Sequence, residues 1–104
     1  MKPLDILHGA LAEFFRYNKY PLALAELRKS LRANTNYRMH WPEVVEAVLS
    51  QRFPEGAALD ALVQAANLPL YEDNEAEAYR WLSLMVVNSV AEEGFPILPY
   101  NERP

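Results

Sequence analysis

The sequence predicts an all-α protein, a compact five-helix bundle, and two observations support this fold class. Apolar residues recur at three- and four-residue intervals along most of the chain, which places them on one face of successive helices. Outside these patterns, no run of alternating apolar and polar residues is long enough to predict a strand. With 104 residues the chain has room for one hydrophobic core. We therefore expect a single helical domain over residues 1–104.

The first two helices are expected over residues 3–17 and 21–33. Pro3 and Pro21 suit a first helical turn, where the backbone N–H that proline lacks has no partner within the helix. Asn18 is expected to end the first helix in a left-handed conformation. The apolar stripe of this helix is Leu4, Leu7, Leu11, Phe14 and Phe15.

The third and fourth helices are expected over residues 42–53 and 55–66. Residues 34–36, Asn-Thr-Asn, are typical of a turn. Pro42 is therefore expected to open the third helix. Pro54 is expected to separate the two helices, because its ring clashes with the preceding turn and it has no N–H to donate.

The fifth helix is expected over residues 75–92 and has the clearest start signal. Asn74 as N-cap with Glu77 three residues later forms a capping-box pattern. Apolar residues then occupy nearly every face, so we expect this helix at the centre of the bundle. Gly94 is expected to end it, and the prolines of residues 95–104 predict an extended tail.

Charge is unevenly distributed along the chain, whose formal net charge is −4. Residues 1–52 contain eight Lys/Arg and five Asp/Glu, a net of +3. Residues 53–104 contain two Lys/Arg and nine Asp/Glu, a net of −7. Such asymmetry favours a charged partner surface and says nothing about the fold.

Composition excludes several classes of protein. There is no cysteine, so disulfides and thiolate metal sites are excluded. The longest apolar run, residues 84–87, is far shorter than the ~20 residues that span a bilayer. The N-terminus has no uninterrupted apolar stretch typical of a secretory signal. We therefore expect a cytoplasmic protein without membrane contact.

We expect no catalytic residues, no cofactor and no metal site. The histidines are His8 and His40. His40 with Glu43 would make an acid–base couple or half of a metal site, but no metal-ligand spacing accompanies them. A backbone contact at a helix entrance is the simpler role for His40. Three glycines provide no phosphate-binding loop, and the serines all lie within predicted helices rather than on a nucleophile elbow.

An acidic and aromatic stretch before the fifth helix is the candidate partner-binding site. Its residues, with two outlying carboxylates, are Tyr71, Glu72, Asp73, Glu75, Glu77, Glu55 and Asp60. Carboxylates at a helix start interact favourably with the helix dipole, which alone explains three of them. Aromatic residues among acidic ones are also typical of a surface that docks onto a basic protein. Both interpretations remain open.

Two alternatives use other segments. The basic helix region 21–38 predicts a nucleic-acid-associated regulator, although the acidic half of the chain would repel phosphates. Its candidate residues are Arg28, Lys29, Arg32 and Arg38. The apolar residues of the tail predict a homo-oligomeric adaptor, with a homodimer as its simplest form.

In its small size, lack of cysteine and acidic helical character, the chain resembles bacterial immunity proteins of the contact-dependent growth inhibition type. The segments that support this resemblance are residues 70–75, Leu-Tyr-Glu-Asp-Asn-Glu, and residues 79–82, Tyr-Arg-Trp-Leu. The resemblance implies a non-enzymatic inhibitor that binds and blocks a toxin domain, often a basic nuclease. An acidic surface would then steer association with that domain.

Overall fold

A computed structural model describes residues 2–68 and 74–91, and its fold is all-α. Five helical segments follow one another, two of them with a π-helical second half, and the described residues contain no strand. The elements are α1 (Pro3–Ala10) continuing into η1 (Leu11–Phe15), α2 (Tyr20–Ala33), α3 (Thr35–Leu49), α4 (Ala57–Asp60) continuing into η2 (Ala61–Ala65), and α5 (Glu75–Val90). The predicted tail, residues 95–104, lies outside the described residues. Within them, no helix combines the length and apolar character needed to cross a membrane.

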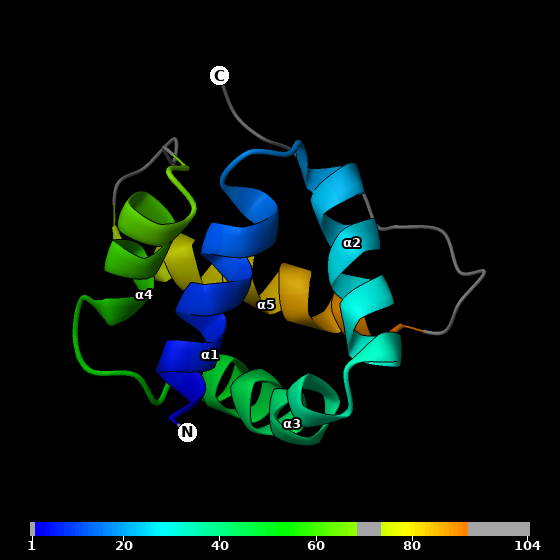
Figure 1. Cartoon of the computed structure of the whole chain (residues 1–104). Coiled ribbons are helices and arrows are strands. Elements are labelled where there is room, and N and C mark those ends of the chain that lie inside the picture. The colour runs from blue at the N-terminus through cyan, green and yellow to red at the C-terminus, as the bar shows by residue number, and fades with distance from the viewer. Residues whose placement is uncertain (1, 69–73, 92–104) are drawn as a thin grey trace.

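The helices cross one another around a shared core (Figure 1). α1 and η1 lie in front of α5, α2 and α4 stand on the two sides, and α3 runs along the bottom. α5 packs against α2, α3 and α4, as expected for a central helix. One side of α5 is nevertheless open, because Val87 is 44% exposed and Val90 57%. The prediction of burial on every face of this helix was therefore only partly right.

Aromatic side chains join three of these elements in the core. Phe15 at the end of η1 and Tyr20 at the start of α2 both contact the indole of Trp81 on α5. The ring centroids are 5.4 and 5.7 Å from that of Trp81, with nearly perpendicular planes. Edge-to-face geometry of this kind brings the positive ring edge to the negative ring face. The cluster fixes the turn between η1 and α2 against α5.

The predicted start of the third helix at residue 42 was wrong. α3 begins at Thr35, because the Asn34 side chain caps it by accepting a hydrogen bond from the Tyr37 N–H at 3.1 Å. The segment interpreted as a turn is thus a helix N-terminus. Pro42 lies within the helix and is exposed. A single missing N–H was outweighed by the cap and by the packing on either side of Pro42.

The predicted end of the third helix at residue 53 was also wrong. α3 ends at Leu49, and Gln51 takes a left-handed conformation with φ of 54°. The Arg52 N–H donates to the Ala47 carbonyl at 2.9 Å, closing the helix end as in a Schellman motif. The helix therefore stops before Pro54 can interrupt it.

The other helix ends lie closer to prediction. The first helical segment ends at Phe15 rather than residue 17. Asn18 is not left-handed as expected, and instead its side-chain amide donates to the Phe14 carbonyl at 2.9 Å. The fourth spans residues 57–65 rather than 55–66, followed by a left-handed Asn67 with φ of 53°. α5 ends at Val90 rather than residue 92, while α2 starts one residue before the predicted 21–33.

Candidate functional site

Glu75, predicted to face a partner, makes contacts within the protein. Its carboxylate accepts hydrogen bonds from the backbone N–H groups of Gly56 at 3.0 Å, Ala58 at 3.3 Å and Leu59 at 2.8 Å. These N–H groups lie at the start of α4, a helix with no side-chain cap of its own. The first N–H groups of a helix lack partners within it, and a carboxylate there also suits the helix dipole. Glu75 therefore fastens α4 to the start of α5.

Of the remaining acidic candidates, the structure describes Glu77, Glu55 and Asp60. Glu77 is buried, with 8% exposure, and its carboxylate pairs with Arg80 at 3.1 Å on the next turn of α5. Glu55 and Asp60 are exposed, at and near α4. Three candidates lie outside the described residues: Tyr71, Glu72 and Asp73. Of the predicted interface, the structure thus leaves two described carboxylates facing solvent.

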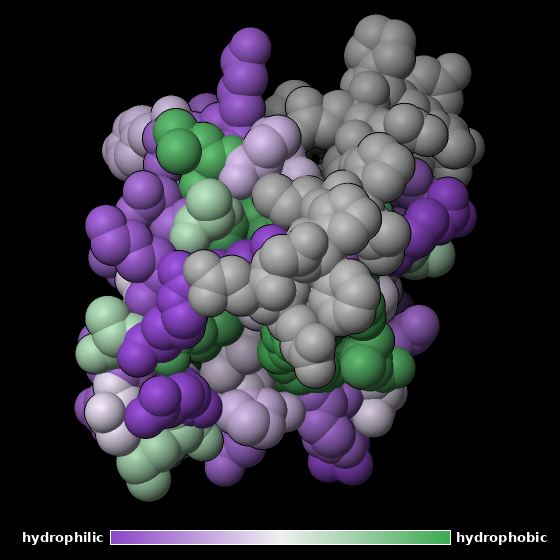
Figure 2. Space-filling model, turned by 90° about the vertical axis from the view of Figure 1, so that its right-hand side faces the viewer, coloured by the Kyte–Doolittle hydropathy of each residue, from purple (hydrophilic) through white to green (hydrophobic). Residues whose placement is uncertain are grey.

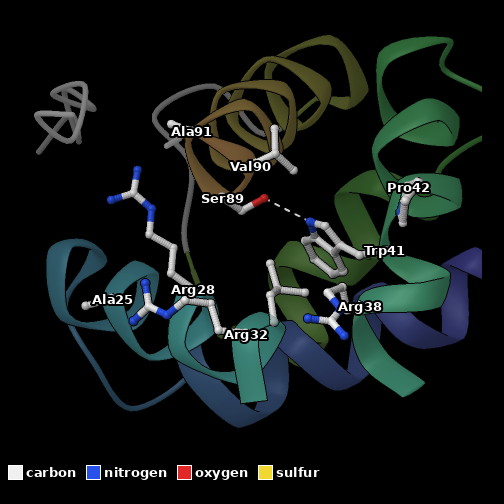
Figure 3. Close-up of a pocket in the computed structure, with 10 residues that line it drawn as sticks. Ala25, Arg28, Arg32, Arg38, Trp41, Pro42, Ser89, Val90 and Ala91 are labelled. Carbon is white, nitrogen blue, oxygen red and sulfur yellow. Dashed lines mark hydrogen bonds between the residues drawn. The ribbon is translucent and has the colours of Figure 1, made fainter. Parts of the chain in front are cut away.

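A pocket between α2, α3 and the end of α5 brings three arginines together (Figure 3). Its volume is about 490 Å³. The lining residues are Ala25, Arg28, Leu31, Arg32, Arg38, Trp41, Pro42, Ser89, Val90 and Ala91. None of them is acidic. In a protein of net charge −4, this arginine pocket is a local concentration of positive charge.

Arg28 is part of the pocket wall rather than a free cation. Its Nε and Nη2 groups donate to the Asn88 carbonyl at 3.0 and 2.6 Å, at the last turn of α5. The last carbonyls of a helix lack partners within it and are the negative end of its dipole. The Asn88 side chain in turn donates to the Tyr20 hydroxyl at 2.8 Å. Burial raises the pKa of Tyr20, so this phenol stays neutral as an acceptor.

Trp41 forms the floor of the pocket, and its polar atom is already engaged. The indole N–H donates to the Ser89 hydroxyl at 2.9 Å, and that hydroxyl donates to the Val86 carbonyl at 2.6 Å. Figure 3 shows the first of these bonds as a dashed line. Trp41 is only 2% exposed. Trp41 therefore offers a ligand neither an exposed ring face nor an unused hydrogen-bonding group.

Arg32 and Arg38 are exposed at the rim of the pocket. Within the described part of the chain, the Arg38 guanidinium has no hydrogen-bond or ion-pair partner. Lys29, grouped with them in the sequence, does not line the pocket. Four-residue spacing would have predicted a shared face for Arg28 and Arg32. The approach of Arg38 depends on the packing of α3 against α2, which no local pattern gives.

A second cavity, about 350 Å³ in volume, lies between α1 and the start of α3. Its lining residues are Asp5, Ile6, Gly9, Glu13, Asn34, Asn36, Tyr37 and His40. The Tyr37 hydroxyl is buried and has no hydrogen-bond partner among the described residues. Burial, and then the negative charge of Glu13, raises the pKa of Tyr37. An unsatisfied buried hydroxyl destabilises the folded state.

The couple of His40 and Glu43 is not assembled around one cavity. His40 lines the second cavity, whereas Glu43 lines a separate groove near the start of α1. Across residues 2–68 and 74–91, no group of three or more His, Cys, Asp or Glu side chains is placed to hold a metal ion.

Comparison with family models, curated proteins and solved structures finds no match for this chain.

Replacing Glu75 tests its structural role. Glu75→Ala leaves three N–H groups of α4 without their acceptor, so we expect the free energy of unfolding to fall by about 1–3 kcal/mol. Glu55→Ala, at an exposed carboxylate, is the matched control and is expected to change it by less than about 0.5 kcal/mol. Urea unfolding followed by circular dichroism measures both. Equal effects would show that Glu75 is no more than another surface charge.

Replacing Tyr37 tests the unsatisfied hydroxyl. Because the folded-state pKa of Tyr37 is raised, its ionisation does not affect stability below the unfolded value of about 10, and stability falls as pH rises further. Tyr37→Phe should therefore leave stability at pH 7 unchanged or increased, and lessen the loss at alkaline pH.

Tyr79→Phe is the control for this substitution, because the Tyr79 hydroxyl accepts a hydrogen bond from the Phe53 N–H at 3.2 Å. It should lower stability by about 1 kcal/mol at pH 7. Denaturant titrations across the alkaline range compare the two variants. A Tyr37→Phe protein that loses as much stability as Tyr79→Phe at pH 7 contradicts the assignment.

Proposed function

We propose that this chain is a non-enzymatic protein-binding module and that the arginine pocket is its binding surface. The observation that supports this proposal is that three arginines line one pocket, and that none of its described lining residues is acidic. The positive charge of these side chains would attract an anion to the pocket. Arginine is also enriched at protein interfaces, where its planar donors and apolar stem both contribute contacts.

The chemistry of the pocket favours binding over catalysis. Among the described lining residues, the side-chain hydroxyl is that of Ser89, which is buried, donates to a backbone carbonyl and accepts from an indole N–H. A nucleophile needs a base to remove its proton, and none of the described lining residues is acidic or a histidine. We therefore propose that the pocket holds and orients a charged group.

The specific version of this proposal is an immunity protein that neutralises a toxin domain by covering it. We place it in the cytoplasm, where a chain without cysteine folds without an oxidising environment. Glu55 and Asp60 support a second version with the opposite polarity, in which an acidic surface meets a basic toxin domain. Both residues are exposed, and α4 lies on the side of the molecule opposite α2 (Figure 1).

Photo-cross-linking in lysate of the native host tests which of the two surfaces contacts a partner. Ala25 and Asp60 are exposed residues at the arginine pocket and on α4 respectively, and each is replaced in turn by p-benzoyl-phenylalanine. We expect the Ala25 variant to cross-link one distinct protein on irradiation, because that partner lies against the pocket. The adducts are resolved on gels and identified by mass spectrometry.

Each result has a defined meaning. The proposal is supported if the Ala25 adduct recurs with one protein and disappears when Arg38→Glu is added. Adducts from Asp60 alone move the partner surface to the acidic side. Adducts of Ala25 with nucleic acid contradict the protein-binding class, and adducts with a second copy of the chain favour self-association.

A further inference from the structure

The arginine pocket divides its charged and apolar groups between rim and floor. Arg32 and Arg38 are exposed at the rim, while Leu31 and Trp41 are buried beneath. Figure 3 shows Arg28 and Arg32 rising from α2 on one side and Arg38 from α3, with the Trp41 indole between the two helices. An occupant that matches this division has an anionic group beside an apolar one.

The three arginines are not equivalent toward such an occupant. Two donor groups of Arg28 are bound to the Asn88 carbonyl, so Arg28 fixes the wall. Arg38 has all its donors available within the described structure. A guanidinium in that state offers paired N–H groups that match a carboxylate in a two-pronged contact. Arg38 is therefore the residue placed to bind the anion directly.

The apolar contact is supplied by two exposed side chains of the pocket lining, Pro42 and Val90. Val90 is 57% exposed at the end of α5, where it lines the pocket. The hydrogen-bonding groups of Trp41 and Ser89 satisfy each other, so a polar ligand group gains no partner there. Figure 2, which looks onto the α2 side, shows hydrophobic groups set among hydrophilic ones on the described surface. A large apolar side chain beside the anion fits this environment.

The same features disfavour nucleic acid as the occupant. Single-stranded nucleic acid binds by stacking its bases on exposed aromatic rings along a basic track. Trp41 is 2% exposed and cannot serve as a stacking platform. The three arginines line one pocket of about 490 Å³, a size that suits a few amino-acid side chains. The net charge of −4 would also repel a longer phosphate backbone.

We infer that the arginine pocket takes a short acidic segment of a partner protein, in which Asp or Glu adjoins a large apolar residue. The carboxylate binds Arg38 at the positively charged rim, and the apolar side chain lies against the exposed Pro42 and Val90. This inference rests on the proposed protein-binding function and gives the partner's chemistry.

Fluorescence anisotropy with short labelled peptides tests the inference. The probe is Gly-Asp-Phe-Glu-Leu-Gly, with Gly-Asn-Phe-Gln-Leu-Gly as the uncharged match and Gly-Asp-Gly-Glu-Gly-Gly as the match without apolar side chains. We expect the first peptide to bind at least about tenfold more tightly than either control, because charge-assisted hydrogen bonds and apolar burial both contribute. A labelled thymidine oligonucleotide is expected to bind more weakly than the first peptide.

Variants locate the binding. Arg38→Glu should weaken binding of the first peptide by about tenfold or more. Lys29→Glu reverses a charge on α2 outside the pocket and should change it by less than about threefold, since exposed charges act mainly through screened long-range attraction. Circular dichroism verifies that both variants are folded.

Two outcomes overturn the inference: equal losses in both variants, or no binding of the acidic peptide by the folded wild-type protein up to about 1 mM. If the Ala25 cross-link to one protein persists while the peptides fail, the protein-binding function stands and the partner chemistry is wrong. If both fail, the function fails with it.

Discussion

The last turn of α5 is the point on which the arrangement of the other helices depends. Its Asn88 carbonyl receives Arg28 from α2, and the Asn88 side chain reaches back to Tyr20 at the start of the same helix. One residue later, Ser89 receives the Trp41 indole from α3. Polar contacts thus fix three helices, α2, α3 and α5, at one place. Apolar packing alone would not define their relative orientation. The arginine pocket exists because these contacts hold its walls.

The same principle operates at the opposite end of α5. Glu75 places its carboxylate at the N-terminus of α4, as Arg28 places its guanidinium at the C-terminus of α5. In both cases a charged side chain from one helix satisfies backbone groups at the end of another. Charges that would favour a partner if exposed are used instead to join helices. Fewer charged side chains are consequently left free to contact a partner than the count of charged residues suggests.

The sequence alone predicted the fold class and the number of helices, because apolar residues recur at three- and four-residue intervals within each helix. The ends of α3 were not predictable from Pro42 and Pro54, since the Asn34 cap and the left-handed Gln51 determine them. Proline gives a strong local preference, but tertiary packing and capping can outweigh one lost hydrogen bond.

The candidate site was less predictable than the fold. Nothing local to Glu75 indicates that its carboxylate reaches α4, although α4 begins at Gly56-Ala57-Ala58 without a capping side chain, which is a signal that an acceptor must come from elsewhere. The basic residues were identified by type, yet their grouping required the structure. Arg38 belongs to a different helix from Arg28, and Lys29 is excluded from the pocket by its position on α2.

The most direct test of this account compares the unfolding free energies of Arg28→Met and Arg38→Met. Methionine keeps an apolar stem and removes the guanidinium in both cases. If Arg28 builds the wall and Arg38 faces a ligand, Arg28→Met should lose about 1–3 kcal/mol and Arg38→Met less than about 0.5 kcal/mol. Equal losses, or a larger loss for Arg38→Met, would contradict the central role given to the end of α5.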